Sequence, residues 1–390
     1  MKPLRLVIAT ARFWPQTGSA ESTLARLAVG LADRGCRVTI LTARWHERWP
    51  AEIRFHGLPV VRLSPAPHGY WNTWRFQRAM GQWLRRHESE FDVAMVSGLR
   101  HEAYAAMLAL GRRKPVVLCP IRSGREGDCL WQIDASGGQK IYRECIRASA
   151  LIAWTPAIRR ELQAAGYPRE RIHELRLGVP LPPARTAETH ASARALLAEA
   201  NAMLQLGDRA QLVVSTCRLA PGRGWEHLLA AWGRVCDRRP GARLWLAGET
   251  FDRPLVQRKI EQLGLVGRAG AIGVFDDMEG LLAAADMLVA PAPDGSPVAV
   301  LEAMAAQLPV VACDVPANQW LITDRGEGLL VPPADVAGLA TAILTLLEQR
   351  DLAARLAAAA RDRAAGEFSL AGMVDENLAL LEKLTPLDRS

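Results

Sequence analysis

Short apolar runs alternate with amphipathic stretches along almost the whole chain. The runs are about four residues long, whereas the stretches between them repeat apolar residues at the helical spacing of three and four. The first half predicts strands at 6–9, 38–41, 60–63, 93–96, 116–119, 151–154 and 172–175, and helices at 22–34, 74–87 and 156–165. The second half predicts strands at 212–216, 243–247, 287–290, 310–312 and 328–331, and helices at 225–236, 254–263, 278–285, 298–306 and 336–349. Strands that alternate with helices indicate βαβ units and parallel sheets.

A proline-rich segment interrupts this alternation in the middle of the chain. Residues 178–183 are Gly-Val-Pro-Leu-Pro-Pro, which cannot continue a helix, so we expect a linker between two doubly wound α/β domains, residues 1–180 and 181–369. No repeat of about 20 to 50 residues is visible, which excludes solenoids and propellers. Sheets of this kind bind ligands at the carboxyl ends of their strands, so the cleft between the domains is the expected site.

The composition is that of a globular protein and excludes several classes. The chain has 390 residues, of which 49% are hydrophobic and 23% charged, values that exclude disordered and fibrous proteins. No apolar run reaches the ~18 residues of a membrane span, and the first residues lack the pattern of a signal peptide, so we expect a cytoplasmic protein. The seven cysteines are scattered and none forms CxxC, which argues against a zinc site and a disulfide framework.

The charge is divided unevenly between the two halves. Residues 1–180 carry 28 basic and 15 acidic side chains, a net +13, whereas residues 181–390 carry 20 basic and 26 acidic ones, a net −6. This asymmetry predicts an anionic partner or membrane surface for the first domain. The alternative is a compositional bias of the genome, because 43 of the 48 basic residues are Arg. No nucleic-acid recognition module is visible, so nucleic acid is not an expected partner.

Two carboxylates stand close together after the predicted strand at 287–290. Residues 294–304 are Asp-Gly-Ser-Pro-Val-Ala-Val-Leu-Glu-Ala-Met, and Pro297 suits the first turn of a helix. Asp294 then lies on the loop and Glu302 about one to two turns into the helix, so both side chains can reach one ligand. The helix N-terminus offers free N–H groups and a partial positive charge to an anion such as a diphosphate.

Two arginines flank a glycine in the loop after the predicted strand at 212–216. Residues 217–224 are Cys-Arg-Leu-Ala-Pro-Gly-Arg-Gly, which places Arg218 and Arg223 on either side of Gly222. Two fixed cations beside a glycine-rich loop can neutralise an anion such as a diphosphate without a metal. The alternative is that both are solvated loop arginines.

These two segments resemble glycosyltransferase family 4, whose members are retaining transferases of the GT-B fold. The family carries an E-x7-E signature, and residues 294–312 are similar to it, with Asp294 at the first Glu and Gln307 at a helix-ending Gly. Asp294 shortens the reach of the carboxylate by roughly 1.5 Å, and Gln307 stands where a left-handed backbone favours glycine. Residues 217–224 resemble the family's GRLxPxKG run, with Arg223 at the usual Lys.

The resemblance extends over most of the chain. Residues 17–21, Thr-Gly-Ser-Ala-Glu, resemble a GGAE loop in which glycine lets the backbone approach donor phosphate or acceptor, so Gly18 is a candidate. Residues 273–277, Gly-Val-Phe-Asp-Asp, resemble the loop that lies against the nucleotide base, so Phe275 is another. Other segments also match family landmarks, namely residues 148–172, 327–333 and 367–370.

The resemblance implies a fold and a reaction. The fold would be two Rossmann-like domains facing each other across a cleft, with a C-terminal helix at 370–385 that packs back on the first domain. The reaction would be metal-independent, retaining, hexosyltransferase-type transfer from a nucleotide-sugar co-substrate, without a cofactor, to a hydroxyl of a glycan, lipid or small molecule. The expected catalytic residues are Arg218, Arg223 and Asp294. The expected donor-binding residues are Gly18, Gly222, Arg218, Arg223, Phe275, Asp294, Gly295, Ser296, Pro297, Val298 and Glu302.

One feature of the family is absent. Many members have a His after the strand that corresponds to 116–119, whereas residues 120–128 here are Pro-Ile-Arg-Ser-Gly-Arg-Glu-Gly-Asp. Arg122, Arg125 and Asp128 are candidates for a differently built acceptor or sugar site, and a polar surface loop is the alternative. No HxxxH or Ser/His/Asp pattern supports a hydrolase or a metal site.

Trp and Arg gather in the first domain, at 44–49, 70–78 and 83–86. On a helix, Trp74 lies near Arg78 and shares a face with Trp71, as in membrane-surface helices whose rings lie at the headgroups and whose Arg meet anionic lipid. Three interpretations stay open: peripheral contact with an anionic inner membrane face, an acceptor site for anionic glycans, and aromatic packing beneath a surface helix.

A non-catalytic homologue is the rival interpretation. Asp294, Leu177, Ser19 and the absent His favour a protein that binds a sugar nucleotide and acts as a partner or scaffold. The intact arginines of the 217–224 loop, together with Glu302, favour an enzyme. A nucleotide-sugar epimerase of the same fold is less favoured, because it needs carboxylate and His acid–base groups that the chain does not clearly offer.

Overall fold

The chain forms two compact units in a computed structural model. The structure describes residues 3–16, 18–111, 113–207, 210–249, 252–275, 277–295 and 297–385, without the side chains of residues 125 and 203. Unit 1 comprises Met1–Gly178 and Leu370–Ser390, and unit 2 comprises Val179–Ser369. The first boundary lies at 178, whereas the sequence predicted 180. The reason is that the N–H of Val179 donates to Phe368 O at 2.9 Å and Val179 pairs with Ser369, which ties it to unit 2.

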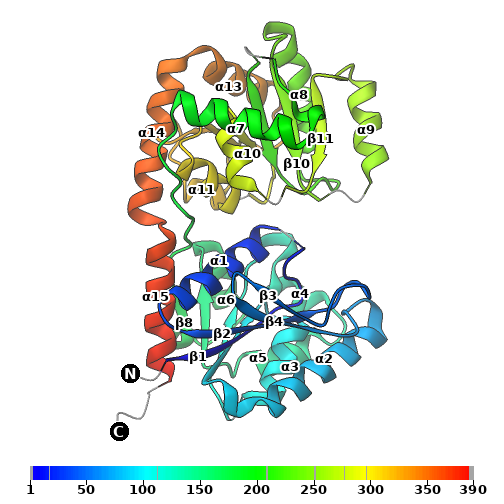
Figure 1. The fold of residues 1–390 in the computed structure, drawn as a ribbon, viewed down its shortest axis with the longest axis vertical. Helices are drawn as coiled ribbons and strands as arrows, with labels where there is room; N and C mark the ends of the chain where they lie inside the picture. Colours follow the sequence, from blue (N-terminus) through cyan, green and yellow to red (C-terminus); the bar gives the residue numbers. More distant parts are fainter. Residues whose placement is uncertain are drawn as a thin grey trace. The chain divides into compact units, whose positions relative to one another are not determined.

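Unit 1 is built on a sheet of eight strands (Figure 1). In spatial order they are β3 (Glu52–Phe55), β4 (Leu58–Leu63), β2 (Arg37–Ala43), β1 (Arg5–Ala9), β5 (Val93–Ser97), β6 (Val116–Cys119), β7 (Ala150–Ala153) and β8 (Ile172–Glu174). Neighbouring strands are parallel except β3 and β4, which form an antiparallel hairpin. The chain leaves β1 toward β2 on one side and returns to β5 on the other, so the strand order reverses between β1 and β5.

The α-helices of unit 1 are α1 (Ser19–Asp33), α2 (Gly69–Arg86), α3 (His101–Leu110), α4 (Asp128–Asp134), α5 (Gly138–Cys145), α6 (Pro156–Ala164) and α15 (Leu370–Leu384). Short 3-10 turns occur at Glu88–Glu90, Gly124–Glu126 and Arg169–Arg171. The C-terminal helix α15 packs on α1, where a Cβ on Gly30 would lie 2.4 Å from Val374. Arg34 pairs with Asp375 at 2.9 Å along the same contact.

Unit 2 is built on a second sheet, of six strands that are all parallel. In spatial order they are β11 (Ala269–Gly273), β10 (Arg243–Ala247), β9 (Leu212–Thr216), β12 (Met287–Ala290), β13 (Val310–Cys313) and β14 (Leu329–Val331). The strand order reverses between β9 and β12. Open α/β sheets bind ligands at such a reversal, outside the carboxyl ends of the strands. The loops after β9 and β12 are therefore where a ligand of unit 2 is expected.

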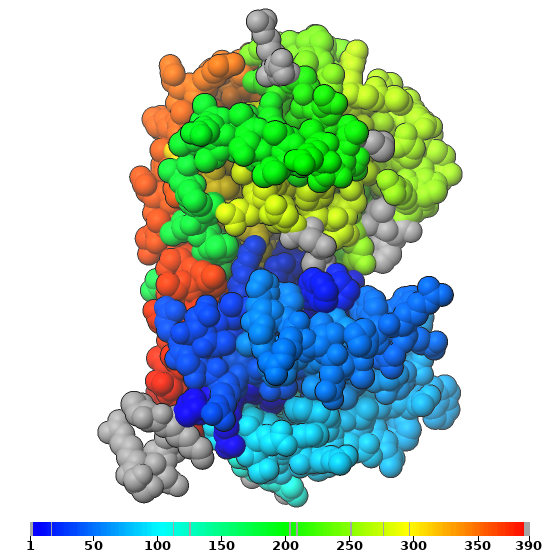
Figure 2. All heavy atoms as spheres, in the orientation of Figure 1, coloured from blue at the N-terminus to red at the C-terminus, as the bar shows by residue number. Residues whose placement is uncertain are grey.

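The α-helices of unit 2 are α7 (Ala187–Ala200), α8 (Trp225–Arg238), α9 (Arg253–Gln262), α10 (Met278–Ala284), α11 (Pro297–Ala305), α12 (Pro316–Gln319), α13 (Val336–Glu348) and α14 (Arg350–Glu367), with a 3-10 turn at Ala202–Leu204. The indole rings of Trp225 and Trp232 on α8 are buried in the core beneath the sheet. Helix α7, in green, lies on the surface that Figure 2 presents.

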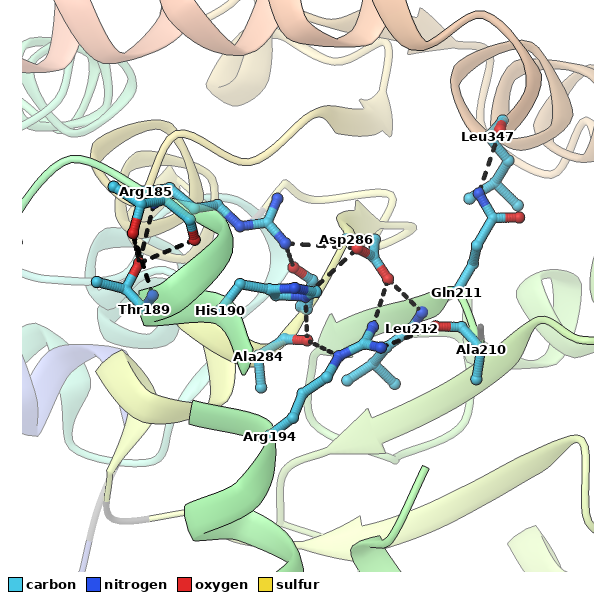
Figure 3. Close-up of polar contacts among 12 residues, drawn as sticks. Arg185, Thr189, His190, Arg194, Ala210, Gln211, Leu212, Ala284, Asp286 and Leu347 are labelled. Carbon is cyan, nitrogen blue, oxygen red and sulfur yellow. Dashed lines mark hydrogen bonds and ion pairs between the residues drawn. The ribbon is translucent and has the colours of Figure 1, made fainter. Parts of the chain in front are cut away.

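An ionic cluster fastens α7 to the amino end of β12 (Figure 3). Asp286 pairs with Arg194 at 2.6 Å and with Arg185 and His190 at 3.4 Å each. It also accepts the backbone N–H of Leu212 at 2.7 Å, which ties the start of β9 to the same carboxylate. Because Asp286 precedes β12, the cluster lies at the edge of the sheet opposite the loops that follow β9 and β12.

Each strand that the sequence predicted is present, four of them with the predicted bounds: β6, β9, β10 and β12. Two strands were not predicted. β3 carries exposed charged residues in alternation and lacks an apolar run, and β11 is an edge strand, mostly of Ala and Gly, that is only partly buried. The helices α3, α4, α5, α7, α12 and α14 were not predicted either.

All seven cysteines are buried and unbridged, as the scattered spacing predicted. In the part of the chain that the structure describes, none of the helices is both long and apolar enough to span a bilayer.

Candidate functional site

Two loops meet at the strand-order reversal of unit 2. The β9–α8 loop ends at Gly224, whose φ is +82°, and a Cβ there would lie 2.1 Å from Pro291 O on the loop after β12. A side chain at residue 224 would therefore push the loops apart. Trp225 Nε1 donates to Ala220 O at 2.9 Å and closes the turn between them. The glycine that the sequence placed at the end of this loop is thus required by close backbone approach.

The β12–α11 loop is held from its other side by the segment that follows β13. Gly295 has a φ of +82°, and a Cβ there would lie 2.6 Å from Ala317 and 3.3 Å from Asn318 Oδ1. Asn318 is fully buried and donates from Nδ2 to Cys313 O at 2.8 Å. Cys313 Sγ in turn donates to Pro291 O at 3.0 Å. The loop that carries Asp294 is therefore held between the β9–α8 loop and the segment that follows β13.

Arg223 and Asp294 form a direct ion pair across the two loops, from Nη1 to Oδ2. Their side chains are 18% and 28% exposed, so the pair is largely removed from water. The second carboxylate oxygen, Asp294 Oδ1, is buried and has no hydrogen-bond partner among the described residues. The structure thus brings together two of the three expected catalytic residues and leaves a buried acceptor atom beside them.

The other expected residues of unit 2 lie on the same edge of the sheet. Arg218 follows β9 and is partly buried, and Gly222 is exposed with a φ of +76°. Pro297 begins α11, Val298 is buried behind it, and Glu302 is partly buried on the same helix. Ser296 and Asp276 lie outside the described residues.

Phe275 is on the loop after β11, two strands away from β9, and is partly buried. Backbone contacts connect its loop to the site: Gly248 N donates to Gly273 O at 2.7 Å, and a Cβ on Gly248 would lie 2.1 Å from Cys217 O. Leu219 N also donates to Glu249 O at 2.9 Å. The loops after β9, β10 and β11 are therefore fastened to one another.

The remaining predicted residues lie in unit 1. Gly18 precedes α1 in an extended conformation, with a φ of −175°, so its backbone does not require glycine. A Cβ there would instead meet Glu21 Oε2 at 2.5 Å. Residue 17 lies outside the described residues, and nothing is described of the Arg125 side chain.

A buried ionic cluster joins the segments that follow β5 and β6 in unit 1. Asp128, at the start of α4, is 5% exposed and accepts from Arg100 Nε at 2.7 Å. Arg100 also donates from Nη2 to Glu126 O at 2.8 Å and lies over the Trp131 ring at 5.3 Å. The surface-loop alternative is therefore wrong for Asp128: the residue is buried because it anchors the loop that follows β5.

Glu102 belongs to this cluster and was missed by sequence reasoning. Its Oε2 atom is buried and has no hydrogen-bond partner among the described residues. Burial, with a contribution from the nearby Asp128 charge, raises the pKa of Glu102 to about 7, against the influence of Arg100 and Arg122. Burial likewise raises the pKa of Asp128. The only signal in the sequence was an acidic residue in the first turn of a helix after a buried strand, which is common.

The aromatic residues of unit 1 divide into two groups. Trp45 and Trp83 are partly buried against the core, as the packing interpretation predicted. At the start of α2, however, Tyr70, Trp71 and Trp74 are 80%, 73% and 49% exposed, so that interpretation is wrong for them. Arg78 lies over the Trp74 ring at 5.7 Å, as the helical spacing predicted.

No group of three or more His, Cys, Asp or Glu side chains with the geometry of a metal site occurs within the described ranges.

Comparisons with known proteins agree with the motifs. Residues 20–181 match the model of Glycosyltransferase Family 4, and residues 210–349 match the model of Glycosyl transferases group 1. The lipopolysaccharide core biosynthesis glycosyltransferase LpsE of Rhizobium meliloti (strain 1021) is 33% identical over 175 residues, 44% of this chain and 50% of LpsE. The alpha-D-kanosaminyltransferase of Streptomyces kanamyceticus is 27% identical over 234 residues, 59% of each protein. The chain thus spans about half the length of these curated relatives.

Solved structures share the fold. Anabaena Alr3699/HepE, in complex with UDP and glucose, matches with a TM-score of 0.77 at 21% identity, covering 97% of this chain and 99% of that one. WaaG, a glycosyltransferase involved in lipopolysaccharide biosynthesis, matches with a TM-score of 0.70 at 18% identity, covering 97% and 99%. Similarity to structures at this low level of sequence identity establishes the fold only. The chain belongs to family 4 of the group 1 glycosyltransferases and has the GT-B fold.

Proposed function

We propose that this protein is a glycosyltransferase that moves a sugar from a nucleotide-sugar donor to a hydroxyl of an acceptor. The observation that carries the proposal is the Arg223–Asp294 pair at the strand-order reversal of unit 2, with the buried, unpartnered Oδ1 of Asp294 beside it. A guanidinium and an acceptor oxygen held side by side suit the two adjoining parts of such a donor, a diphosphate and a sugar hydroxyl. One solved relative, Alr3699/HepE, has been crystallised in complex with UDP-glucose, which supports this class of donor.

Each residue of the site has a proposed part. Arg218 and Arg223 hold the diphosphate and stabilise the charge it gathers on leaving. Asp294 accepts a hydrogen bond from a hydroxyl of the sugar, and Glu302 accepts hydrogen bonds from the ribose hydroxyls. The backbone N–H groups of Gly295, Ser296 and Val298 hold sugar or phosphate oxygens. We propose no metal and no cofactor, because two guanidinium groups and a helix N-terminus supply the positive charge that the leaving group needs.

The stereochemistry and the sugar class are finer parts of the proposal. Family resemblance supports retention at the anomeric carbon and a hexose as the transferred sugar. NMR of the anomeric proton in the product distinguishes retention from inversion. Undiminished activity in EDTA is expected if no metal takes part, and loss of activity that returns with Mg²⁺ contradicts that expectation.

We propose that unit 1 binds the acceptor, and that the acceptor is a glycan or lipid-linked glycan. Arg122 lies near the buried Asp128 and Glu102, beside the segments that follow β5 and β6, where it is suited to an anionic group on the acceptor. The exposed rings of Tyr70, Trp71 and Trp74 and the arginines of α2 suit contact with an anionic bilayer. Relatives named for lipopolysaccharide core biosynthesis and phosphatidyl-myo-inositol mannosyl transfer support this class of acceptor.

A panel of donors tests the proposal. Thermal unfolding is recorded with UDP-, GDP- and ADP-sugars, and each donor that raises Tm is then assayed for hydrolysis and for transfer to candidate acceptors. We expect one nucleotide class to stabilise the protein by mass action and to be turned over. Binding without turnover on any acceptor contradicts the enzyme. No binding at all contradicts the donor site itself.

A further inference from the structure

The Arg223–Asp294 pair joins groups that the proposed function assigns to different parts of the donor, and the inference rests on that function. In the proposed function Arg223 binds the diphosphate, whereas Asp294 binds the sugar. Yet the two side chains bind each other in the structure. Gly224 lies against Pro291 O, and Gly295 lies against side-chain atoms of Ala317 and Asn318, so each loop is in close contact with its neighbour. The negative charge of Asp294 therefore stays beside whatever anion Arg223 holds.

The intact donor and the nucleoside diphosphate that remains after transfer meet this pair differently. Both bring a diphosphate, and Arg223 has five N–H donors, enough to hold a phosphate oxygen while it stays on Asp294 Oδ2. Only the intact donor also brings a sugar hydroxyl that can donate to the buried Oδ1 atom. With the diphosphate alone, Oδ1 keeps no partner and the carboxylate repels the added negative charge. Both effects are strong because the pair is largely shielded from water.

We propose that Asp294 makes the site discriminate between nucleotide-sugar and nucleoside diphosphate, favouring entry of the donor and release of the product. The carboxylate offsets part of the attraction of Arg223 for any diphosphate, and the sugar hydroxyl compensates for this loss. The site thus binds the sugar-bearing form in preference to the spent nucleotide. This effect goes beyond holding the sugar, because it predicts that removing the charge of Asp294 improves the binding of one ligand.

The test compares matched ligands on Asp294→Asn. Calorimetry measures Kd for UDP and UDP-glucose, GDP and GDP-mannose, and ADP and ADP-glucose, and the pair that binds the wild type is used throughout. We expect Asp294→Asn to bind the nucleoside diphosphate about tenfold more tightly, because a charge repulsion is gone, and to gain no affinity for the nucleotide-sugar. The ratio of the two dissociation constants then moves by about tenfold, and product inhibition strengthens by the same factor. Asp294→Ser, which also lacks the charge, moves the ratio in the same direction.

A matched control removes one negative charge from unit 2 at a distance from the site. Asp237 is exposed in the last turn of α8, which runs away from the Arg223 loop toward the opposite edge of the sheet. Asp237→Asn is expected to leave both dissociation constants unchanged. If Asp294→Asn binds the nucleoside diphosphate no more tightly than the wild type does, the discrimination is refuted and the donor site stands. If the wild type binds none of the nucleotide-sugars, the proposed function fails instead.

Discussion

Glu102 is a carboxyl group in a place that disfavours its charge. Its Oε2 atom is buried without a partner among the described residues, and its pKa is raised to about 7 from an ordinary value of 4.5. Below about pH 4.5 the group is protonated in both the folded and the unfolded chain. Between the two values the unfolded chain loses the proton while the folded chain keeps it, so the free energy of unfolding falls as pH rises. This loss of unfolding free energy is complete above the pKa that Glu102 has in the folded chain, and it amounts to at most roughly 3 kcal/mol.

Glu102→Gln is therefore expected to stabilise the protein at pH 8 by about 1 to 3 kcal/mol and to flatten the dependence of stability on pH between 5 and 8. Urea unfolding at several pH values measures both effects. Glu188→Gln is the matched control, because Glu188 is also acidic, lies in the first turn of a helix and is exposed. Equal pH dependence in Glu102→Gln and the wild type would show that Glu102 does not titrate in this range.

Gln307 ends α11 in a conformation that glycine adopts more easily. Its φ is +57°, and the bonds from Gln307 N to Met304 O and from Leu308 N to Ala303 O close the helix around it. The sequence pattern had already marked this position, since family members have glycine there. A left-handed backbone costs a residue with a side chain about 1 to 2 kcal/mol.

Gln307→Gly is expected to raise the free energy of unfolding by about 1 kcal/mol, after the greater freedom of glycine in the unfolded chain is subtracted. Gln307→Ala retains the Cβ and is expected to gain nothing. Denaturant unfolding of the two variants measures the difference, and a destabilised glycine variant would mean that the Gln side chain makes a compensating contact.

Among elements, α7 is held by an ionic cluster that centres on one carboxylate. Asp286 joins Arg185, His190 and Arg194 to the first residue of β9, and all four side chains are less than a third exposed. Asp286→Asn leaves two arginines without their counter-charge and is expected to lower the free energy of unfolding by about 1 to 3 kcal/mol. Because the cluster lies at the opposite edge of the sheet, Kd for the nucleotide-sugar is expected to stay unchanged.

An exposed ion pair supplies the comparison for this element. Arg238 and Glu348 pair at 3.1 Å with side chains 65% and 32% exposed, and Glu348→Gln is expected to cost less than about 1 kcal/mol. Urea unfolding of both variants ranks the two pairs. Equal costs for Asp286→Asn and Glu348→Gln would contradict the role of Asp286 in fastening α7.

The elements themselves were predictable where the sequence pattern is local. The bounds of β9, β10 and β12 were predicted from the runs at 212–216, 243–247 and 287–290, because strands buried on both faces are largely apolar. The loops that carry Arg223 and Asp294 were found for the same reason, since they directly follow such strands. The Asp286 cluster and the environment of Glu102 could not be found, because they join residues about 30 to 100 positions apart whose approach depends on the whole fold.

At the scale of the whole molecule, the basic half of the chain presents exposed Trp and Arg side chains on α2. Trp71 and Trp74 are exposed on α2, next to the exposed Arg75 and to Arg78. Binding of the protein to vesicles with anionic lipid is expected to exceed binding to neutral vesicles and to weaken as salt is added. Trp71→Ser/Trp74→Ser is expected to reduce it about tenfold or more, because two interfacial rings are lost.

Sedimentation with phosphatidylcholine vesicles, with and without phosphatidylglycerol, measures this binding. Leu196→Ser is the control, because Leu196 is 63% exposed on α7 in the acidic half. Equal binding to both vesicle types would mean that the net positive charge of residues 1–180 reflects amino-acid composition alone.

The central claim is that the loops after β9 and β12 hold the diphosphate of a nucleotide-sugar. The most direct measurement is the sugar-transfer rate of an Arg218→Ala/Arg223→Ala double variant, with the donor that the panel identifies. Removing two charge-assisted contacts to the leaving group is expected to lower kcat/KM by about 100-fold or more while the protein stays folded. Full activity in the folded double variant would contradict the account.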